Sequence, residues 1–250
     1  MNNTPKPLKY LRILLQTDLL VLLKNTRALV VSIVVPIYIL FITNRQSKST
    51  IGTPVFLIVL AITIGILSTS IVGYALTVAR DRERGIFQRL RVTPAPIWTI
   101  MMSRLLIQAL ANVTIALIVL IVGSRMHHLS LGIGEYLAAL LVATLGGAVF
   151  LAIGQALVGL IKSAATVNAV GSLLYVALLL GGLLGPSGVL GSTFQNISQW
   201  TPVGTVIAVF QSALHQTAWN NHSWLSLLAC LSYIIVCAAI GIKWFQWEAR

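Results

Sequence analysis

The best candidates for chemistry are the charged side chains of "VARDRERGIFQRLRVTPAP", residues 78–96, where five arginines, Asp81 and Glu83 stand between two long apolar runs. Such a set can pair with charges on another surface. Arginines are expected in any loop held on the cytoplasmic side of a membrane, so by themselves they leave a topology signal and a docking surface equally open. The two acids favour docking, because charges of both signs fix the register and the choice of a partner.

The residues that follow Gly85 have the spacing of a short amphipathic helix. Ile86, Phe87 and Leu90 would share one apolar face, with arginines on the flanks. Pro94 would end the helix, because proline cannot continue it. A helix of this kind, joined to an apolar run on either side, could fit a groove on a partner and pass force to both runs.

Patterns for catalysis are missing from the sequence. It holds no Gly-x-x-x-x-Gly-Lys phosphate loop and no Gly-x-Ser-x-Gly nucleophile elbow. His127 and His128 are adjacent, but no third ligand stands near them, so an exposed polar pair is a better interpretation than a metal site. We therefore expect no enzyme, and no cofactor or metal site, in this chain.

The composition is that of an integral membrane protein. Of the 250 residues, 57% are hydrophobic and only 9% are charged, whereas a typical soluble domain has about 25% charged residues. The mean hydropathy is +0.92. The net charge of +12 is better explained by basic cytoplasmic loops than by nucleic-acid binding, which we do not expect.

Six apolar segments are long enough to cross a membrane as helices, since about 30 Å of hydrocarbon takes roughly 20 residues. They are residues 25–43, 55–78, 97–123, 136–161, 167–184 and 224–244. Residues 1–250 should therefore form one all-α membrane domain with six transmembrane helices. With the N-terminus inside the cell, 14 of the 17 Lys and Arg residues lie on the cytoplasmic side, so we expect both termini there.

Two further segments are neither simple spans nor loops. Residues 1–24 place apolar and basic side chains on opposite sides of a helix, which predicts a helix at the cytoplasmic interface, although Asp18 falls outside the pattern. A deeper extension of the first span is the alternative. Residues 185–223 carry no Lys, Arg, Asp or Glu, and their apolar part is too short to cross. They predict a re-entrant helical hairpin with its turn near residues 191–202.

The expected spans hold no acidic residue near their centres. Proton-driven transporters generally carry Asp, Glu or His there. The chain therefore has the body of a transporter without an energy source of its own, and residues 79–96 are the best candidate for the docking site of an external one.

The segment "DRERGIFQRLRVTP" resembles the signature that follows the second span in ABC type-2 exporter permeases. The matching residues are Glu83, Gly85, Leu90, Thr93 and Pro94. Asp81 stands where that family commonly has glutamate. The segment "QWTPVGTVIAVFQSAL" resembles a second element of the family, in which Pro202 matches and Thr201 replaces the usual asparagine. The resemblance extends over the whole chain.

This resemblance implies a pair of permease chains in membrane lipid, either two identical copies or close siblings. Two separate ATP-binding cassette ATPase subunits would bind ATP and Mg below them and contact the coupling loop, residues 79–96. The candidate contact residues are Asp81, Glu83, Arg84, Gly85, Ile86, Phe87, Leu90 and Pro94. The resemblance also implies a substrate path lined mainly by the first, second and fifth spans. Its candidate residues are Tyr38, Thr69, Ser70, Tyr74, Asn168, Ser172 and Tyr175, each of which could equally bind a neighbouring helix.

The uncharged hairpin would lie above this path as an outer gate, with Trp200, Pro202 and Phe210 as candidates. The function expected from the resemblance is ATP-driven export of an amphipathic drug, antibiotic or lipid-like molecule across a bacterial cell membrane. An ion-coupled secondary transporter or channel is one alternative. A non-transport subunit for membrane assembly or ligand sensing is the other.

Overall fold

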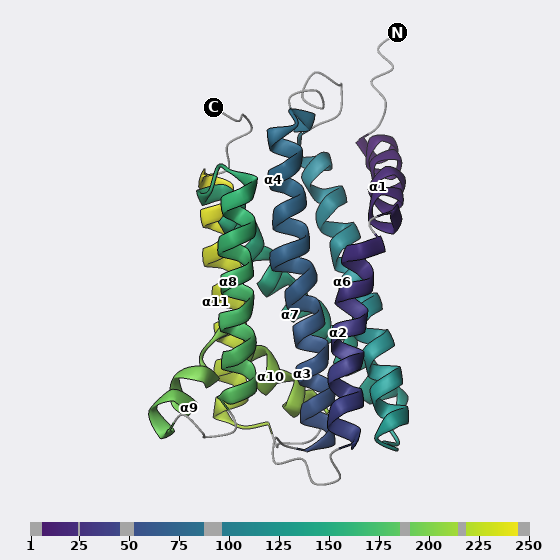
Figure 1. Cartoon of the computed structure of the whole chain (residues 1–250), viewed down its shortest axis with the longest axis vertical. Helices are drawn as coiled ribbons and strands as arrows, with labels where there is room; N and C mark the ends of the chain where they lie inside the picture. Colours follow the sequence, from purple (N-terminus) through teal and green to yellow (C-terminus); the bar gives the residue numbers. More distant parts are fainter. Residues whose placement is uncertain are drawn as a thin grey trace.

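The computed structural model describes residues 7–24, 26–45, 53–87, 97–185, 191–214 and 219–244. All regular secondary structure in these ranges is helical, as the sequence predicts. Figure 1 shows the long helices side by side in one bundle, with two short helices at its lower end.

The long helices correspond to the expected spans. They are α2 (Thr26–Arg45), α6 (Ile97–Met126), α7 (Ile133–Leu160), α8 (Ala164–Leu184), α11 (Asn221–Trp244), and a continuous rod of α3 (Pro54–Leu67), the π-helix η1 (Ser68–Tyr74) and α4 (Ala75–Glu83). Within the described residues, five are long and apolar enough to cross a membrane: the α3–α4 rod, α6, α7, α8 and α11. In α2 the described apolar segment Ser32–Ile42 is shorter, so the sixth span stays a prediction.

The α3–α4 rod forms the core of the bundle because α3 is apolar on every side. Residues 55–67 are all buried, and a helix without a polar face must be surrounded by others. Helices α2, α6, α7 and α8 contact it. The Thr53 hydroxyl caps its start by accepting a hydrogen bond from the N–H of Phe56 (3.3 Å). Pro54 takes the first helical position, where a missing N–H does no harm.

Helix α7 approaches its neighbours closely because glycines lie at the contacts. A Cβ atom on Gly159 would come 3.1 Å from the Cα atom of Gly241 on α11. A Cβ atom on Gly154 would come 2.7 Å from the carbonyl oxygen of Ser70 in η1. Small residues allow such backbone approach in membrane bundles, where close packing drives helix association.

Three short helices complete the fold: α1 (Pro7–Lys24), α9 (Ser192–Gln199) and α10 (Pro202–Ala213). The last two lie in the segment predicted to be a hairpin, but residues 192–199, which were predicted as its turn, form helix α9. Helices α9 and α10 are separated by Trp200 and Thr201, and Thr201 caps α10 by accepting a hydrogen bond from the N–H of Gly204 (3.1 Å). The apolar side of α10 is buried against the bundle. The depth of the hairpin in a membrane stays a prediction.

The two ends of the bundle differ in charge. Figure 1 places α1, the end of α4 and the end of α11 at its upper end, which we call the α1 end, and α9 and α10 at the α10 end. Basic residues at the α1 end include Arg82, Arg104 and Lys243, whereas Arg125 lies in the last turn of α6 at the other end. This agrees with the predicted grouping of basic residues. That the α1 end faces the cytoplasm stays a prediction.

Replacing Gly159 by valine should destabilise the bundle by about 1–3 kcal/mol, because the added methyl groups would meet the backbone of α11. Thermal unfolding of the purified protein in detergent micelles measures the change. Gly134 gives the matched control, since no atom lies within 4 Å of a Cβ atom placed there. An equal loss in Gly134→Val would assign the effect to helix propensity instead of packing.

Candidate functional site

Arg82, at the end of α4, closes the carboxyl end of α7. Its side chain is only 2% exposed. The guanidinium donates hydrogen bonds to the carbonyl oxygens of Val158 (2.8 Å), Ile161 (2.6 Å) and Lys162 (2.7 Å). The last carbonyls of a helix lack partners within the helix and carry partial negative charge. A planar cation with several donors therefore suits this position better than a lysine would.

Glu83, the next residue, closes the start of α8. Its Oε1 atom accepts a hydrogen bond from the N–H of Ala164 (2.6 Å), the first residue of that helix. The free N–H groups and partial positive charge of a helix N-terminus favour a carboxylate there. Two adjacent side chains of opposite charge thus hold both ends of the turn at residues 161–163. We call this arrangement the Arg82–Glu83 clamp.

The chain turns away from α4 directly after the clamp. Gly85 has a φ angle of +67°, and its N–H donates a hydrogen bond to the carbonyl oxygen of Arg82 (3.0 Å). Glycine is favoured in this left-handed conformation after a helix, because a Cβ atom would be strained there. Gly85 therefore lets the chain leave α4 while both clamp residues stay in place.

Three helices meet at Arg104 of α6. Its guanidinium forms an ion pair with Asp81 of α4 (2.6 Å) and lies over the ring of Phe87, 4.8 Å from the ring centroid. The neighbouring Ser103 hydroxyl donates a hydrogen bond to the carboxylate of Asp18 on α1. These five residues form the Arg104 cluster. The cluster explains why Asp18 breaks the amphipathic pattern of α1: its side chain contacts α6.

Several predicted coupling residues thus have partners inside the chain. Asp81 pairs with Arg104, and Glu83 caps α8. Phe87 was expected on an outward apolar ridge. Instead it is 1% exposed and packs in a core cluster with residues of α4 and α6. The ring also contacts Arg104 on α6, and the spacing of apolar residues in the sequence cannot predict this contact.

The other predicted coupling residues are less enclosed. Arg84 is exposed, as is Glu83 outside its bond to α8, and Ile86 is half-buried. Leu90 and Pro94 lie outside the described residues, as does most of the expected amphipathic helix. Docking of a partner on residues 79–96 stays a prediction.

The π-helix η1 carries a buried polar network in the middle of the bundle. The Thr69 hydroxyl donates to Oδ1 of Asn112 on α6 (2.6 Å), and Nδ2 of Asn112 donates to the Ser70 hydroxyl (3.0 Å). Gln108, one turn earlier on α6, donates to the carbonyl oxygen of Thr69 (3.3 Å). Widened turns of this kind are rare and frequently mark functional positions.

A separate polar contact of η1 reaches α7 and borders a cavity. The Tyr74 hydroxyl donates to Oε1 of Gln155 (2.7 Å). A cavity of about 460 Å³ lies beside them, lined by Tyr74, Asn112, Gln155 and mostly apolar side chains of α6, α7 and α11. The hydrogen bonds matter because each unsatisfied polar group in hydrocarbon costs several kcal/mol.

The predicted path residues fall into two groups. Thr69, Ser70 and Tyr74 are buried in the network of a single chain. The second group is partly or fully exposed on α2 and α8 and consists of Tyr38, Asn168, Ser172 and Tyr175. Tyr38 is more exposed than Tyr175, with 61% of its surface accessible. The two groups therefore cannot line one continuous surface of the isolated chain.

Three amide residues that bond to η1 were not singled out from the sequence: Gln108, Asn112 and Gln155. A signal for them exists, because amides inside apolar spans are costly and generally need partners in the bundle. Gln108 and Asn112 also lie four residues apart, which places them on one helix face. Their partners on the rod could not be read from that spacing.

The sequence profile described as "ABC-2 family transporter protein" matches residues 9–243. The chain belongs to the ABC-2 family. It is also similar to the Bacillus subtilis (strain 168) protein "Putative transport permease YvfS", with 23% identity over 172 residues that cover 68% of this chain and 69% of that protein. The resemblance expected from the sequence is thereby confirmed.

As a member of this family, the chain is a transport permease component, and such permeases generally work with an ATP-binding cassette ATPase. The predicted gate residues of the permease lie at the α10 end. Trp200 is exposed, its ring meets that of His222 edge-on at 5.4 Å, and its carbonyl accepts a hydrogen bond from the Tyr233 hydroxyl (2.7 Å). Pro202 begins α10, and Phe210 is fully buried in the core. Gating by these residues stays a prediction.

Replacing Arg82 by lysine should lower the free energy of unfolding of the permease by about 2 kcal/mol. A single ammonium cannot reach all three carbonyls that the two terminal nitrogens of the guanidinium contact, so buried carbonyls would be left unpaired. Denaturant unfolding in detergent measures the change. The same substitution at exposed Arg84 is the control and should stay within about 0.5 kcal/mol of the parent. Equal stability of the two variants would show that the clamp contributes nothing.

A second prediction concerns pH. Burial raises the pKa of the Asp18 carboxyl above its ordinary value of 3.8, although the Ser103 hydrogen bond and the Arg104 charge oppose this shift and Asp81 adds to it. The folded permease then holds this proton more tightly than the unfolded chain. The resulting stability is complete below pH 3.8 and is lost as the pH rises through the raised pKa.

The thermal midpoint of the parent protein should therefore fall, relative to that of Asp18→Asn, as the pH rises from about 3.8. Comparison of the two proteins cancels the titration of the other acids. A constant difference between the two midpoints over this range would contradict a raised pKa.

Proposed function

We propose that the chain is the permease subunit of an ATP-driven exporter in a bacterial cell membrane. Its cargo would be an amphipathic drug, antibiotic or lipid-like molecule taken from the cytoplasm or the inner leaflet. Membership of the ABC-2 family supports the transport role. The Arg82–Glu83 clamp is the observation that carries the proposal. Because Arg82 bonds to α7 and Glu83 bonds to α8, a force applied to the end of α4 would reach both of these helices directly.

The proposed assembly holds two copies of the chain, or one copy and a close sibling, above two ATPase subunits that bind ATP and Mg. The ATPases would dock on residues 79–96. Arg84 and Ile86 are accessible for such contact, and Leu90 and Pro94 belong to the same predicted segment. Asp81 and Glu83 would contribute indirectly, by fixing this segment to α6 and α8.

Coupling would work through displacement of α4. A shift of its end displaces the Arg82 guanidinium, which is bonded to the end of α7, and the Glu83 carboxylate, which is bonded to the start of α8. Breaking these bonds would leave a buried cation unpaired at a cost of several kcal/mol. The turn at residues 161–163 would therefore follow α4, and α8 would tilt.

The exposed faces of α2 and α8 are the proposed walls of the path between two copies. They present Tyr38 and Asn168 together with apolar side chains and no described acid. A neutral surface of this kind suits cargo with both apolar and polar parts. The outer gate would be the α9–α10 hairpin, with Trp200 and Pro202 at the turn and Phe210 holding α10 to the bundle.

The matched pair Glu83→Gln and Glu135→Gln tests the coupling step. Both carboxylates accept a backbone N–H at a helix start: Glu83 from Ala164 at α8, and Glu135 from Gly132 (2.7 Å) at the opposite end of α7. Each variant, tagged and expressed in its native host, would be purified with its ATPase and reconstituted in liposomes. Rhodamine 6G, an amphipathic dye, serves as the transport probe.

Glu83→Gln should lower dye moved per ATP hydrolysed by about tenfold, the factor that corresponds to 1.4 kcal/mol, while Glu135→Gln transports as the parent does. If both variants transport normally, the clamp does not couple. If no ATP-binding cassette ATPase accompanies the parent protein, the proposed function itself is wrong.

A further inference from the structure

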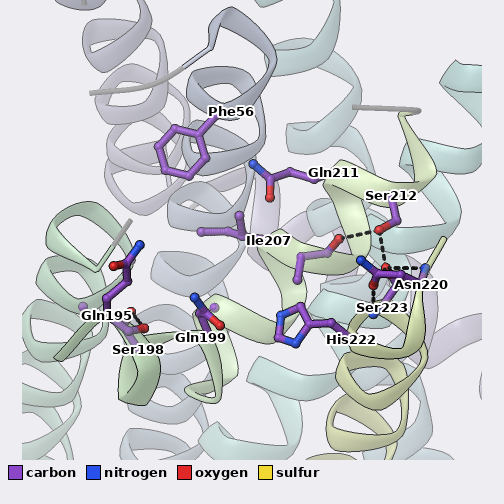
Figure 2. A pocket seen from close by; sticks show the side chains of 14 residues that line it. Phe56, Gln195, Ser198, Gln199, Ile207, Gln211, Ser212, Asn220, His222 and Ser223 are labelled. Atoms are coloured by element: carbon purple, nitrogen blue, oxygen red, sulfur yellow. Dashed lines mark hydrogen bonds between the residues drawn. The ribbon is translucent and has the colours of Figure 1, made fainter. Parts of the chain in front are cut away.

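A second cavity lies at the α10 end of the bundle, opposite the end that holds the clamp. It has a volume of about 280 Å³ and lies between α8, α9, α10 and the start of α11. Figure 2 shows Phe56 and Ile207 on one side of it and His222 on the other, with the side chains of Gln195, Gln199 and Gln211 around it.

The glutamine amides differ from the other polar groups of this cavity. Ser198 donates to the carbonyl oxygen of Gln195 (2.8 Å), and Ser223 bonds with Asn220 (3.1 Å). Within the described part of the chain, the side-chain amides of Gln195, Gln199 and Gln211 have no hydrogen-bond partner. Three amides, each with donors and an acceptor, are therefore available to a molecule in the cavity.

No Lys, Arg, Asp or Glu lines this cavity, and the imidazole of His222 is the one titratable side chain in its lining. The sequence explains this, because most of the lining belongs to residues 185–223, which hold no Lys, Arg, Asp or Glu. An ionised ligand would lose hydration here without gaining an opposite charge, which is unfavourable. The site therefore suits a neutral ligand that donates and accepts hydrogen bonds, as a hydroxyl group does.

The glycines that line the cavity lie at two close helix contacts and at one open position. A Cβ atom on Gly182 would come 2.6 Å from a methyl carbon of Val203, and one on Gly204 would overlap the carbonyl oxygen of Ser198. These contacts pack α8, α9 and α10 closely against one another beside the cavity. Gly181 also lines the cavity, but no atom lies within 4 Å of a Cβ atom placed there. A side chain at this position would enter empty space.

We propose that this cavity binds one neutral polyhydroxylated ring, that is, a sugar, through the amides of Gln195, Gln199 and Gln211. Its volume is near the lower limit for small-molecule pockets, about 300 Å³, so one ring fits and a chain of rings does not. The ring is either a free sugar or the headgroup of a glycolipid, since both offer the same hydroxyls. The proposal does not depend on ATP-driven export.

The test uses the purified permease in phosphatidylcholine nanodiscs, where both ends of the protein are accessible. The two neutral probes are methyl β-glucoside, for a free sugar, and octyl β-glucoside below its micelle concentration, for a lipid headgroup. Octyl sulfate and octyltrimethylammonium have the same chain with a charged head. Tryptophan fluorescence gives the affinity, and hydrogen–deuterium exchange of residues 191–214 locates the site.

At least one glucoside should bind and slow exchange in residues 191–214, while both charged probes bind at least tenfold more weakly. Binding of both glucosides assigns a free sugar, and binding of octyl β-glucoside alone assigns a headgroup. Gly181→Leu fills the cavity, and Gln199→Leu removes an amide from an exposed position, so each should weaken glucoside binding at least tenfold. Gly134→Leu, at another open glycine, should bind as the parent does.

The proposal is overturned if neither glucoside binds, if the charged probes bind as tightly, or if Gly181→Leu keeps the parent affinity. Thermal unfolding of each variant distinguishes a lost site from a lost fold. A permease that fails to export dye but binds glucoside would leave this site intact and reject only the proposed function.

Discussion

The burial of one cation determines how the α1 end of this permease can move. Arg82 has lost almost all its hydration, and the carbonyls of Val158, Ile161 and Lys162 accept bonds from its two terminal nitrogens, while its Nε atom has no partner in the described residues. A buried charge without such partners is far more costly than an exposed one. Helix α4 is therefore tied to that turn, and Glu83 adds an independent bond to α8. Any motion of α4 has to carry both helices or lose these contacts.

The sequence predicts the helices well because each has local signals. Thr53 and Pro54 mark the start of α3, and Gly85 marks the end of α4. It does not predict the partners of Arg82, which lie 76 to 80 residues further along the chain. A mixed-charge segment indicates only that its acids need cations. Whether those cations belong to another protein or to the same one depends on tertiary packing, which periodicity does not encode.

The neutral amide side chains of this fold form two groups, which differ in whether they are hydrogen-bonded to the protein. Asn112 and Gln155 are buried in the bundle and bond to hydroxyls of the rod, so they stabilise the contact of α6 and α7 with it. Gln199 and Gln211 line a cavity without a partner in the described residues. Sequence alone treats all four as polar residues in a mostly apolar context. The first two amides have protein partners inside the bundle, whereas those of exposed Gln199 and half-buried Gln211 are open to water or to the proposed ligand.

Helix α8 joins the two ends of the molecule. Its first residue, Ala164, is bonded to Glu83, while Gly182 near its other end packs against Val203 of α10. An α-helix of 21 residues is about 30 Å long, at 1.5 Å per residue. A tilt imposed at the clamp must therefore change the space beside Gly181 at the α10 end. In the proposed mechanism, a ligand seated against Gly181 would resist that tilt, because the clamp and the ligand would both contact α8.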